Sequence, residues 1–105
     1  MNEWTVIYTA KAQEDILRLD NTIRKRVQKT IARVSQNPLP YTEGGYGKPL
    51  GGELSGCLKV KFRSLGVRVV YRLQRTEHSM EIIVVGVRSG SEVYTVAEER
   101  LKRLL

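Results

Sequence analysis

The sequence contains few of the residues that disulfide-bonded, metal-binding or membrane proteins need. Cys57 is the only cysteine among the 105 residues, so the chain can form no internal disulfide and no multi-cysteine metal site. The longest strongly apolar run, Ile82 to Val85, is far too short to cross a bilayer. The first residues show neither a basic leader nor an apolar signal segment. We therefore expect a cytoplasmic protein without membrane contacts, in which Cys57 is a buried structural thiol.

Acidic residues are also in short supply. Eighteen Lys and Arg residues outnumber eleven Asp and Glu residues, which gives a formal net charge of +7. A net positive charge attracts polyanions, so nucleic acid is the first candidate partner. Charge alone, however, fits equally well a protein that is basic only for solubility. With 41% hydrophobic and 28% charged residues, the composition is that of a globular protein. We expect one domain over residues 1–105.

The first third of the sequence predicts one short strand and two helices. Trp4 to Tyr8 is β-branched and aromatic, as strands are, and Thr9 can cap a helix that continues to about Leu19. From Thr22 onward, apolar residues recur at helical spacing and basic residues occupy the other faces, until Pro38 ends the pattern. This second helix is therefore amphipathic and strongly basic. It carries two candidate RNA-binding residues, Lys25 and Lys29.

A segment rich in glycine and proline, residues 38–56, separates these helices from three strands. It contains all three prolines and six of the nine glycines, which is typical of a loop. Its Tyr41 and Tyr46 could stack on bases, but loop tyrosines more often pack on their own domain, and we assign them no function. After this segment, alternating apolar residues predict three consecutive antiparallel strands, over residues 58–63, 67–73 and 80–87.

The sequence ends in a predicted helix. Thr95 and Glu98 have the spacing of a capping box, and Ala97, Leu101 and Leu104 then recur on one helical face. The predicted order is therefore strand, two helices, three strands and a helix, without an internal repeat. We expect an α+β fold in which the two N-terminal helices pack on an antiparallel β-sheet, in the order β-α-α-β-β-β-α.

Basic side chains alternate along the first of the three consecutive strands. Lys59, Lys61 and Arg63 leave the same face about 7 Å apart, close to the phosphate spacing of a nucleic-acid strand. For one such strand alone, a solvated outer face is the more common explanation. Arg68, just past the turn on the partner strand, adds a fourth cation at the same end of this face. The combined pattern therefore favours a phosphate-binding patch.

Two further residues complete the candidate site. Arg88 ends the third strand and shares a face with Gly86, where the missing side chain either lets a ligand approach or reflects a bulge or a packing detail. Tyr94 immediately precedes the expected cap Thr95, so an anion near its hydroxyl would also meet the positive end of the last helix. Tyr94 could instead be a core residue. Among several fixed cations, however, its phenolate would be stabilised and could accept a proton.

These residue types suit the cleavage of RNA by its own 2′-hydroxyl. The reaction needs a base for the hydroxyl proton, an acid for the leaving 5′-oxygen, and positive groups around a phosphorane-like transition state. Lysine, arginine and tyrosine can fill all of these roles without a metal or a cofactor. His78, the lone histidine, lies in a predicted turn far from the cationic end of the strands, and we interpret it as a surface residue.

At these positions the chain resembles the RelE family of toxins, part of the wider RelE/ParE superfamily of toxin–antitoxin systems. The likeness covers nearly the whole length and is clearest in KVKFRSLGVRVVY at residues 59–71, and again in VGVR at 85–88 followed by SEVY at 91–94. The resemblance implies a microbial-ribonuclease-like fold and cleavage of messenger RNA in the ribosomal A site, beside 16S ribosomal RNA. It also implies neutralisation by an acidic antitoxin.

The resemblance further implies roles for individual residues. Lys59 and Lys61 correspond to lysines that contact phosphate and transfer protons, and Arg68 corresponds to an arginine that stabilises the transition state. Arg88 corresponds to a candidate acid, and Tyr94 to a candidate base. One more position is implied only to bind RNA, namely Arg63.

Two other functions remain open. A ParE-like toxin would share the fold and inhibit DNA gyrase without cutting RNA. Such chains generally lack the paired arginine and tyrosine that correspond to Arg88 and Tyr94, which argues against this alternative. A basic adaptor, or a toxin that has lost its activity, would bind RNA without chemistry.

Overall fold

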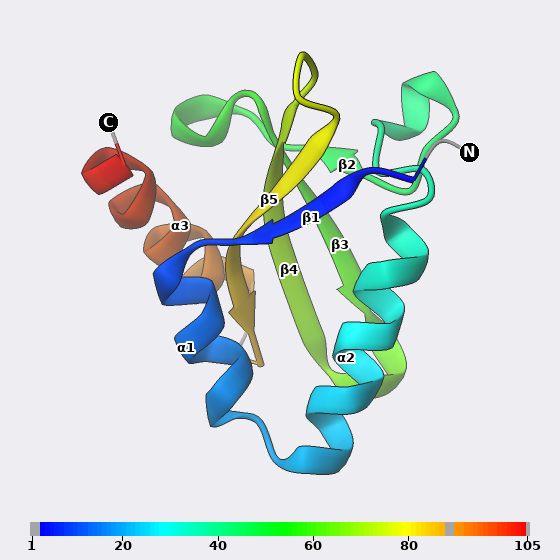
Figure 1. The fold of residues 1–105 in the computed structure, drawn as a ribbon. Coiled ribbons are helices and arrows are strands. Elements are labelled where there is room, and N and C mark those ends of the chain that lie inside the picture. The colour runs from blue at the N-terminus through cyan, green and yellow to red at the C-terminus, as the bar shows by residue number, and fades with distance from the viewer. Residues whose placement is uncertain (1–2, 88–89, 105) are drawn as a thin grey trace.

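A computed structural model of the chain describes residues 3–87 and 90–104 (Figure 1). Within this part, five strands form one sheet in the order β1-β5-β4-β3-β2, and three helices flank it. None of the described helices is long and apolar enough to cross a membrane. The strands are β1 (Thr5–Tyr8), β2 (Lys48–Pro49), β3 (Cys57–Phe62), β4 (Val67–Gln74) and β5 (Ser79–Gly86). The helices are α1 (Ala10–Arg18), α2 (Asn21–Val34) and α3 (Gly90–Leu104).

The expected α+β class is confirmed, with one addition and one correction. The addition is β2, a two-residue strand inside the segment that the sequence predicts to be a loop. The correction concerns β1. Strands β3 to β5 pair antiparallel, as predicted, and β2 pairs antiparallel with β3. Strand β1, however, lies parallel to β5, with Thr5 opposite Ser79 and Tyr8 opposite Ile82. The alternation of side chains indicates which face of a strand is buried, but not the direction of the strand beside it.

Side-chain hydrogen bonds fix the ends of α1 and α2. The Thr9 hydroxyl accepts from the N–H of Ala12 at 3.2 Å, so the predicted cap of the first helix is confirmed. Asp20 caps α2 by accepting from two N–H groups of its first turn. The guanidinium of Arg24 donates to three carbonyl oxygens at the end of α1, those of Ile16, Leu17 and Leu19. These bonds hold the corner between the two helices.

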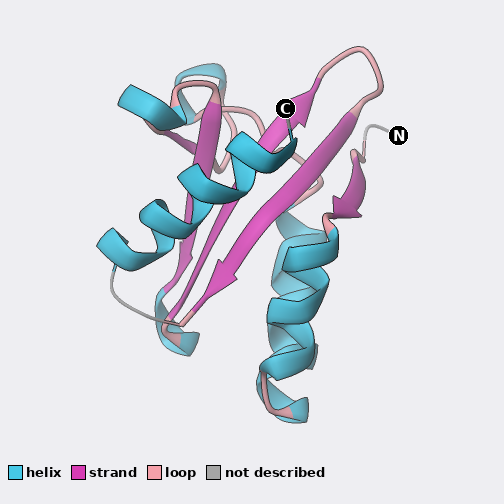
Figure 2. Cartoon of the chain, turned by 90° about the vertical axis from the view of Figure 1, so that its left-hand side faces the viewer, coloured by secondary structure: helices cyan, strands magenta, loops and turns pink. Residues whose placement is uncertain are grey.

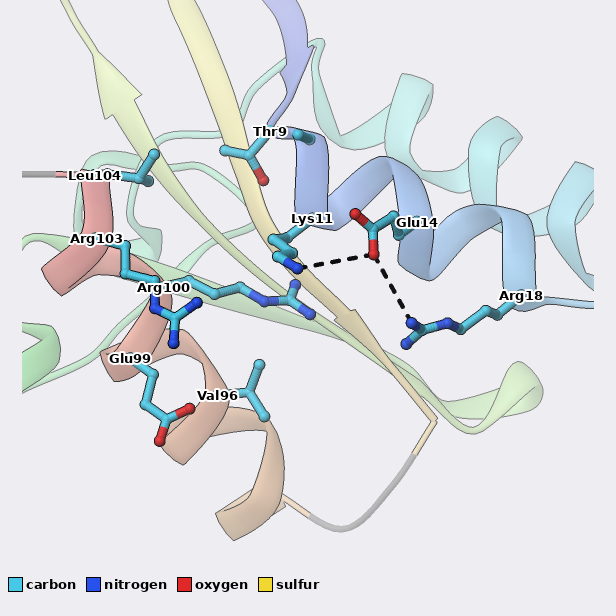
Figure 3. A pocket seen from close by; sticks show the side chains of 10 residues that line it. Thr9, Lys11, Glu14, Arg18, Val96, Glu99, Arg100, Arg103 and Leu104 are labelled. Carbon is cyan, nitrogen blue, oxygen red and sulfur yellow. Dashed lines mark ion pairs between the residues drawn. The ribbon is translucent and has the colours of Figure 1, made fainter.

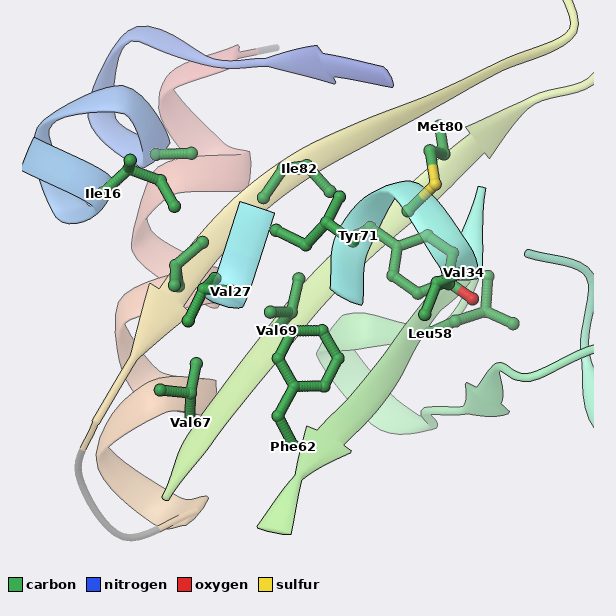
Figure 4. Packing of buried hydrophobic residues seen from close by; sticks show 13 residues of the cluster. Ile16, Val27, Val34, Leu58, Phe62, Val67, Val69, Tyr71, Met80 and Ile82 are labelled. Atoms are coloured by element: carbon green, nitrogen blue, oxygen red, sulfur yellow. The ribbon is translucent and has the colours of Figure 1, made fainter. Parts of the chain in front are cut away.

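Helices cover both faces of the sheet (Figure 2). The helices α1 and α2 pack on one face around side chains such as Val27, Phe62 and Tyr71 (Figure 4), as predicted. The helix α3 packs on the other face through Val93, in a cluster that includes the buried thiol of Cys57. Because successive residues of a strand face opposite layers, the odd-numbered residues of β3 lie on the α3 face.

The last helix begins earlier than the sequence predicts. The helix α3 starts at Gly90, so Tyr94 and Thr95 lie inside it and not at its N-terminus. Two predictions are therefore wrong. Thr95 is not the N-cap of the helix, and the positive N-terminal end of the helix does not lie next to Tyr94. Val93 is only 3% exposed against the sheet, and this burial extends the helix upstream of a capping-box pattern that is a purely local signal.

Candidate active site

The β3–β4 hairpin brings three cations together on the α3 face of the sheet. Lys59 and Lys61 alternate with core residues on β3, and Lys61 lies directly opposite Arg68 of β4. Arg68 is in turn opposite Gly86, so Lys61, Arg68 and the end of β5 form one row across three strands. Lys61 is exposed, whereas Lys59 and Arg68 are half-buried. The structure thus places these three residues side by side, as the strand pattern predicts.

A small pocket opens beside the turn between β3 and β4. Residues Arg63–Leu65 form a 3₁₀ turn, and Gly66 completes it with a φ of 65°, a conformation that side-chain-bearing residues rarely adopt. The pocket has a volume of about 430 Å³. Its lining consists of Lys61, Phe62, Arg63, Gly66, Val67 and Arg68. Half of these residues are cationic, so the pocket suits a phosphodiester group.

The helix α3 carries Tyr94 to the same face. The Nζ atom of Lys59 lies 5.2 Å from the centroid of the Tyr94 ring, within the range of a cation–π interaction. The ring is half-buried and packs against the cluster beneath α3. The sequence left open whether Tyr94 is a core residue or a site residue. It is both, because it packs on the core and also contacts a cation of the candidate site.

Lys61 lies at the electrostatic centre of this arrangement. Lys59 and Arg68, in that order, lower the pKa of the Lys61 ammonium below its ordinary value, and desolvation lowers it further. Tyr94 acts in the opposite direction, and Arg63 adds a smaller lowering. All of these groups therefore lie within electrostatic range of one ammonium. We call the five residues the cationic cluster: Lys59, Lys61, Arg63, Arg68 and Tyr94.

Gly86 allows α3 to approach the sheet. A Cβ atom at this position would lie 2.6 Å from the Cγ2 atom of Val93, closer than two carbon atoms can pack. Of the explanations that the sequence offers for this glycine, close packing of the helix is the one that the structure supports. Because Val93 directly precedes Tyr94, the same contact helps to set the position of the tyrosine above the sheet.

A buried ion pair fixes the second half of α3. The two carboxylate oxygens of Asp15, on α1, accept from the guanidinium of Arg100 at 2.7 and 3.0 Å. The Asp15 carboxylate also accepts from the N–H of Val85, and Arg100 donates to the carbonyl oxygen of Ile83. The pair therefore joins α1, α3 and β5. This pair was not predicted from the sequence, in which the available signal was an acidic residue on the buried face of the first helix.

A pocket of about 390 Å³ lies beside this ion pair, between α1 and α3 (Figure 3). On its α1 wall, Glu14 pairs with Lys11 at 3.9 Å and with Arg18 at 3.8 Å. Val96 and Leu104 contribute apolar surface from α3. Its lining contains no member of the cationic cluster, so among the described residues this pocket is separate from the candidate active site.

Two of the predicted site residues lie apart from this arrangement, and a third is not described. Lys25 and Lys29 are exposed on α2, which covers the face of the sheet opposite to the cationic cluster. Arg88 lies outside the described residues. His78 is exposed in the β4–β5 turn, where its ring stacks on Trp4 with 4.1 Å between the ring centroids, so the interpretation as a surface residue is confirmed.

Lys48 is a further basic residue near the site, and it was not predicted from the sequence. It lies on β2 directly opposite Lys59, and residues opposite each other in an antiparallel pair project from the same face. Lys48 therefore extends the cationic cluster to the edge of the sheet. A strand of two residues has no alternation to reveal it, so no local signal marks this lysine.

Within residues 3–87 and 90–104, no group of three acidic, histidine or cysteine side chains could hold a metal ion.

Comparison with known proteins identifies the family. Residues 6–94 match the family described as the ParE toxin of type II toxin–antitoxin systems. The chain is also 30% identical over 94 residues to the mRNA interferase toxin RelE of Escherichia coli K12, covering 90% of this chain and 93% of that protein. The chain belongs to the RelE/ParE family of toxins. The family resemblance seen in the sequence is thereby confirmed.

Solved structures extend the likeness of this toxin to the whole fold. An arginine double mutant of the Escherichia coli toxin RelE in the free state superposes with a TM-score of 0.74 at 28% identity, over 98% of this chain and 99% of that chain. The toxin–antitoxin complex RelBE2 of Mycobacterium tuberculosis contains a chain that superposes with a TM-score of 0.71 at 29% identity. That match covers 84% of this chain and 94% of the other.

Proposed function

We propose that this toxin is an endoribonuclease that cuts messenger RNA in the ribosomal A site without a metal or a cofactor. The observation that carries the proposal is the convergence of Lys59, Arg68 and Tyr94 on Lys61. The cluster offers, in one place, the positive charge and the proton-transfer groups that cleavage requires. A relative that matches over nearly its whole length, RelE of Escherichia coli K12, is an mRNA interferase, which supports the same activity here.

In the proposed reaction, the 2′-hydroxyl of a bound nucleotide attacks the adjacent phosphorus. Tyr94, as the phenolate, accepts the hydroxyl proton, and Lys59 and Arg68 stabilise the negative charge of the transition state. The bond from phosphorus to the 5′-oxygen then breaks, and Arg88 protonates the leaving oxygen. The products are a 2′,3′-cyclic phosphate and a 5′-hydroxyl end. Lys61 is suited to assist as an acid, because its lowered pKa makes its proton easier to transfer.

Other basic residues would hold the RNA on either side of the reacting phosphate. Arg63 lines the pocket at the β3–β4 turn, and Lys48 lies on the far side of Lys59, at the sheet edge. Arg63 extends the positive surface beyond the end of β3, and Lys48 extends it across the sheet to β2. We propose that the two side chains contact phosphates that flank the cleaved one.

Replacing the tyrosine hydroxyl provides the direct test of this function. Purified toxin is mixed with ribosomes carrying a defined message, and the RNA ends are mapped. Tyr94→Phe keeps the ring beside Lys59 but removes the group that accepts the proton, so we expect cleavage to slow by about 10²–10⁴-fold. Tyr41→Phe, at an exposed tyrosine outside the cluster, is the matched control and should cut like the wild type. A message that stays intact at saturating wild-type toxin rejects the proposal.

We further propose that the cognate partner is an acidic antitoxin. The related Mycobacterium tuberculosis toxin was solved in complex with its antitoxin. With a net charge of +7 on this chain, a negatively charged and partly disordered partner would gain affinity from the basic surface and would fold as it docks. A toxin that shows no affinity for the product of the adjacent gene would contradict this.

The family description also favours a second candidate function, because the matching family is named after ParE. A ParE-like toxin would inhibit DNA gyrase and would need positive charge but no proton-transfer groups. Tyr94 lies beside Lys59 and within electrostatic range of Lys61, so the cluster contains the proton-transfer groups that cleavage needs, and this favours cleavage. A supercoiling assay separates the two functions, and unaffected gyrase at excess toxin removes the alternative.

A further inference from the structure

The helix α2 carries a line of basic side chains that the proposed cleavage reaction does not use. The helix contains five basic residues and no acidic one. Arg24 is engaged at the end of α1, but Lys25, Lys29 and Arg33 are exposed and follow one another four residues apart. This spacing corresponds to about 6 Å along the helix axis. Like charges at this spacing destabilise a helix, so folding alone does not favour the line, whereas a bound polyanion would.

The line leads to an exposed aromatic ring. Tyr46 shares a pocket of about 430 Å³ with Lys29 and Arg33, next to the C-terminal end of α2. The remaining lining residues are Glu3, Ala32, Ser35 and Gln36, so the pocket includes one carboxylate beside its two cations. Tyr46 is 56% exposed, which does not fit the expectation that loop tyrosines pack on their own domain. Its ring offers a flat apolar surface to a ligand.

The backbone on both sides of Tyr46 is tightly held. A Cβ atom at Gly45 would lie 2.0 Å from the carbonyl oxygen of Leu39, and one at Gly47 would lie 2.4 Å from the hydroxyl oxygen of Tyr71. The N–H of Tyr46 donates to the carbonyl oxygen of Asn37 at 3.1 Å. A ring presented on such a fixed backbone loses little conformational freedom when a ligand binds.

We propose that Lys25, Lys29, Arg33 and Tyr46 form a second RNA-binding surface that takes a single-stranded segment. Its phosphates lie along α2, and one base stacks on the Tyr46 ring. The ligand is single-stranded because the bases of a duplex are already stacked on one another and cannot cover the ring. The surface lies on the face of the sheet opposite to the cationic cluster, so it goes beyond the cleavage reaction and does not depend on it.

The test uses RNA that the toxin cannot cut. A fluorescently labelled single-stranded 2′-O-methyl oligonucleotide of roughly ten nucleotides is titrated with the intact toxin, and anisotropy gives the Kd. Loss of the stacked base in Tyr46→Ala should weaken binding by about 5- to 150-fold. Tyr46→Phe keeps the ring and should bind like the wild type. Tyr46→Leu keeps apolar bulk without aromaticity and should weaken binding as Tyr46→Ala does, even if the alanine variant disturbs the loop.

Salt dependence tests the basic line. In Lys29→Gln/Arg33→Gln, two phosphate contacts are lost, so the slope of log K against log salt should become shallower by about 1.4. Lys102→Gln/Arg103→Gln removes the same charge from an exposed part of α3 and is the matched control. The proposal is overturned if Tyr46→Ala binds as tightly as the wild type, if the control variant loses as much, or if duplex RNA competes equally well. It is also overturned if these variants change only the affinity for a protein partner. Because the probe has no 2′-hydroxyl, none of these outcomes bears on cleavage.

Discussion

The pKa of Lys61 depends more on Lys59 than on any other neighbour, ahead of Arg68. Replacing Lys59 by Gln should therefore raise the pKa of Lys61 toward its ordinary value of 10.5, and Arg68→Gln should raise it by less. NMR titration of isotope-labelled lysine side chains measures both values. Lys102→Gln, which removes a charge from the last turn of α3, is the control and should leave the titration unchanged. Equal effects of Lys59→Gln and Lys102→Gln would show that the cluster does not act on Lys61.

The direction of the shift also determines how this lysine affects stability. The folded chain holds the Lys61 proton less tightly than the unfolded chain does, because neighbouring cations repel the ammonium. Between the folded pKa and 10.5, the unfolded state therefore binds more protons, and the stability of the toxin rises with pH in that window. The variant Lys59→Gln should narrow this window.

Single residues of the site differ in how far the sequence predicts them. The positions of Lys59, Lys61 and Arg68 follow from the two-residue period of a strand and from a tight turn, which together fix face and register. The contact of Tyr94 with Lys59 depends on how α3 crosses the sheet. The sequence pointed to Tyr94 through an expected cap that the structure does not have, and through the family resemblance. Lys48 was not predictable, because its strand is too short to carry a pattern.

At the scale of elements, the packing of α3 on β5 depends on the absence of a side chain at Gly86. Gly86→Ala places a methyl group against Val93 and should lower the free energy of unfolding by about 1–3 kcal/mol. Gly51→Ala adds the same methyl group where nothing lies within 4 Å, and its effect should stay within about 0.5 kcal/mol. Urea denaturation measures both variants.

A double-mutant cycle attributes this effect to the contact itself. In a Val93→Ala background the clashing methyl group is gone, so Gly86→Ala should cost clearly less than in the wild type. If the cost is the same in both backgrounds, Gly86 is needed for another reason than the approach of α3.

The elements that the sequence predicts well are those whose signals are local. The cap at Thr9, the basic second helix and the three strands of the meander all follow from periodicity and turn residues. The start of α3 and the direction of β1 do not, because both are set by contacts between distant segments. Val93 packs the first turns of α3 against the sheet, and β1 pairs with β5, a strand that lies far along the chain.

The whole molecule places its positive charge on both faces of one sheet. The cationic cluster lies on the α3 face, and the basic line of α2 lies on the other. These basic residues therefore form two separate surfaces and not one patch. Composition predicts the affinity for a polyanion, but the division into two surfaces becomes visible only when the layers of the fold are known.

The Asp15–Arg100 ion pair holds these layers together, since it joins residues that are 85 positions apart. The two side chains are only 9% and 18% exposed. Arg100→Met leaves a buried carboxylate without its guanidinium, and we expect the free energy of unfolding to fall by about 3–5 kcal/mol. Arg18→Met removes the 75% exposed partner of Glu14 and should cost at most about 1 kcal/mol. Asp15→Leu/Arg100→Met buries no unpaired charge, so its loss should be smaller than the sum of the single variants. Urea denaturation of the wild type, these three variants and Asp15→Leu alone measures all of these effects. An Arg100→Met variant as stable as Arg18→Met would mean that α3 keeps its place over the sheet without this ion pair.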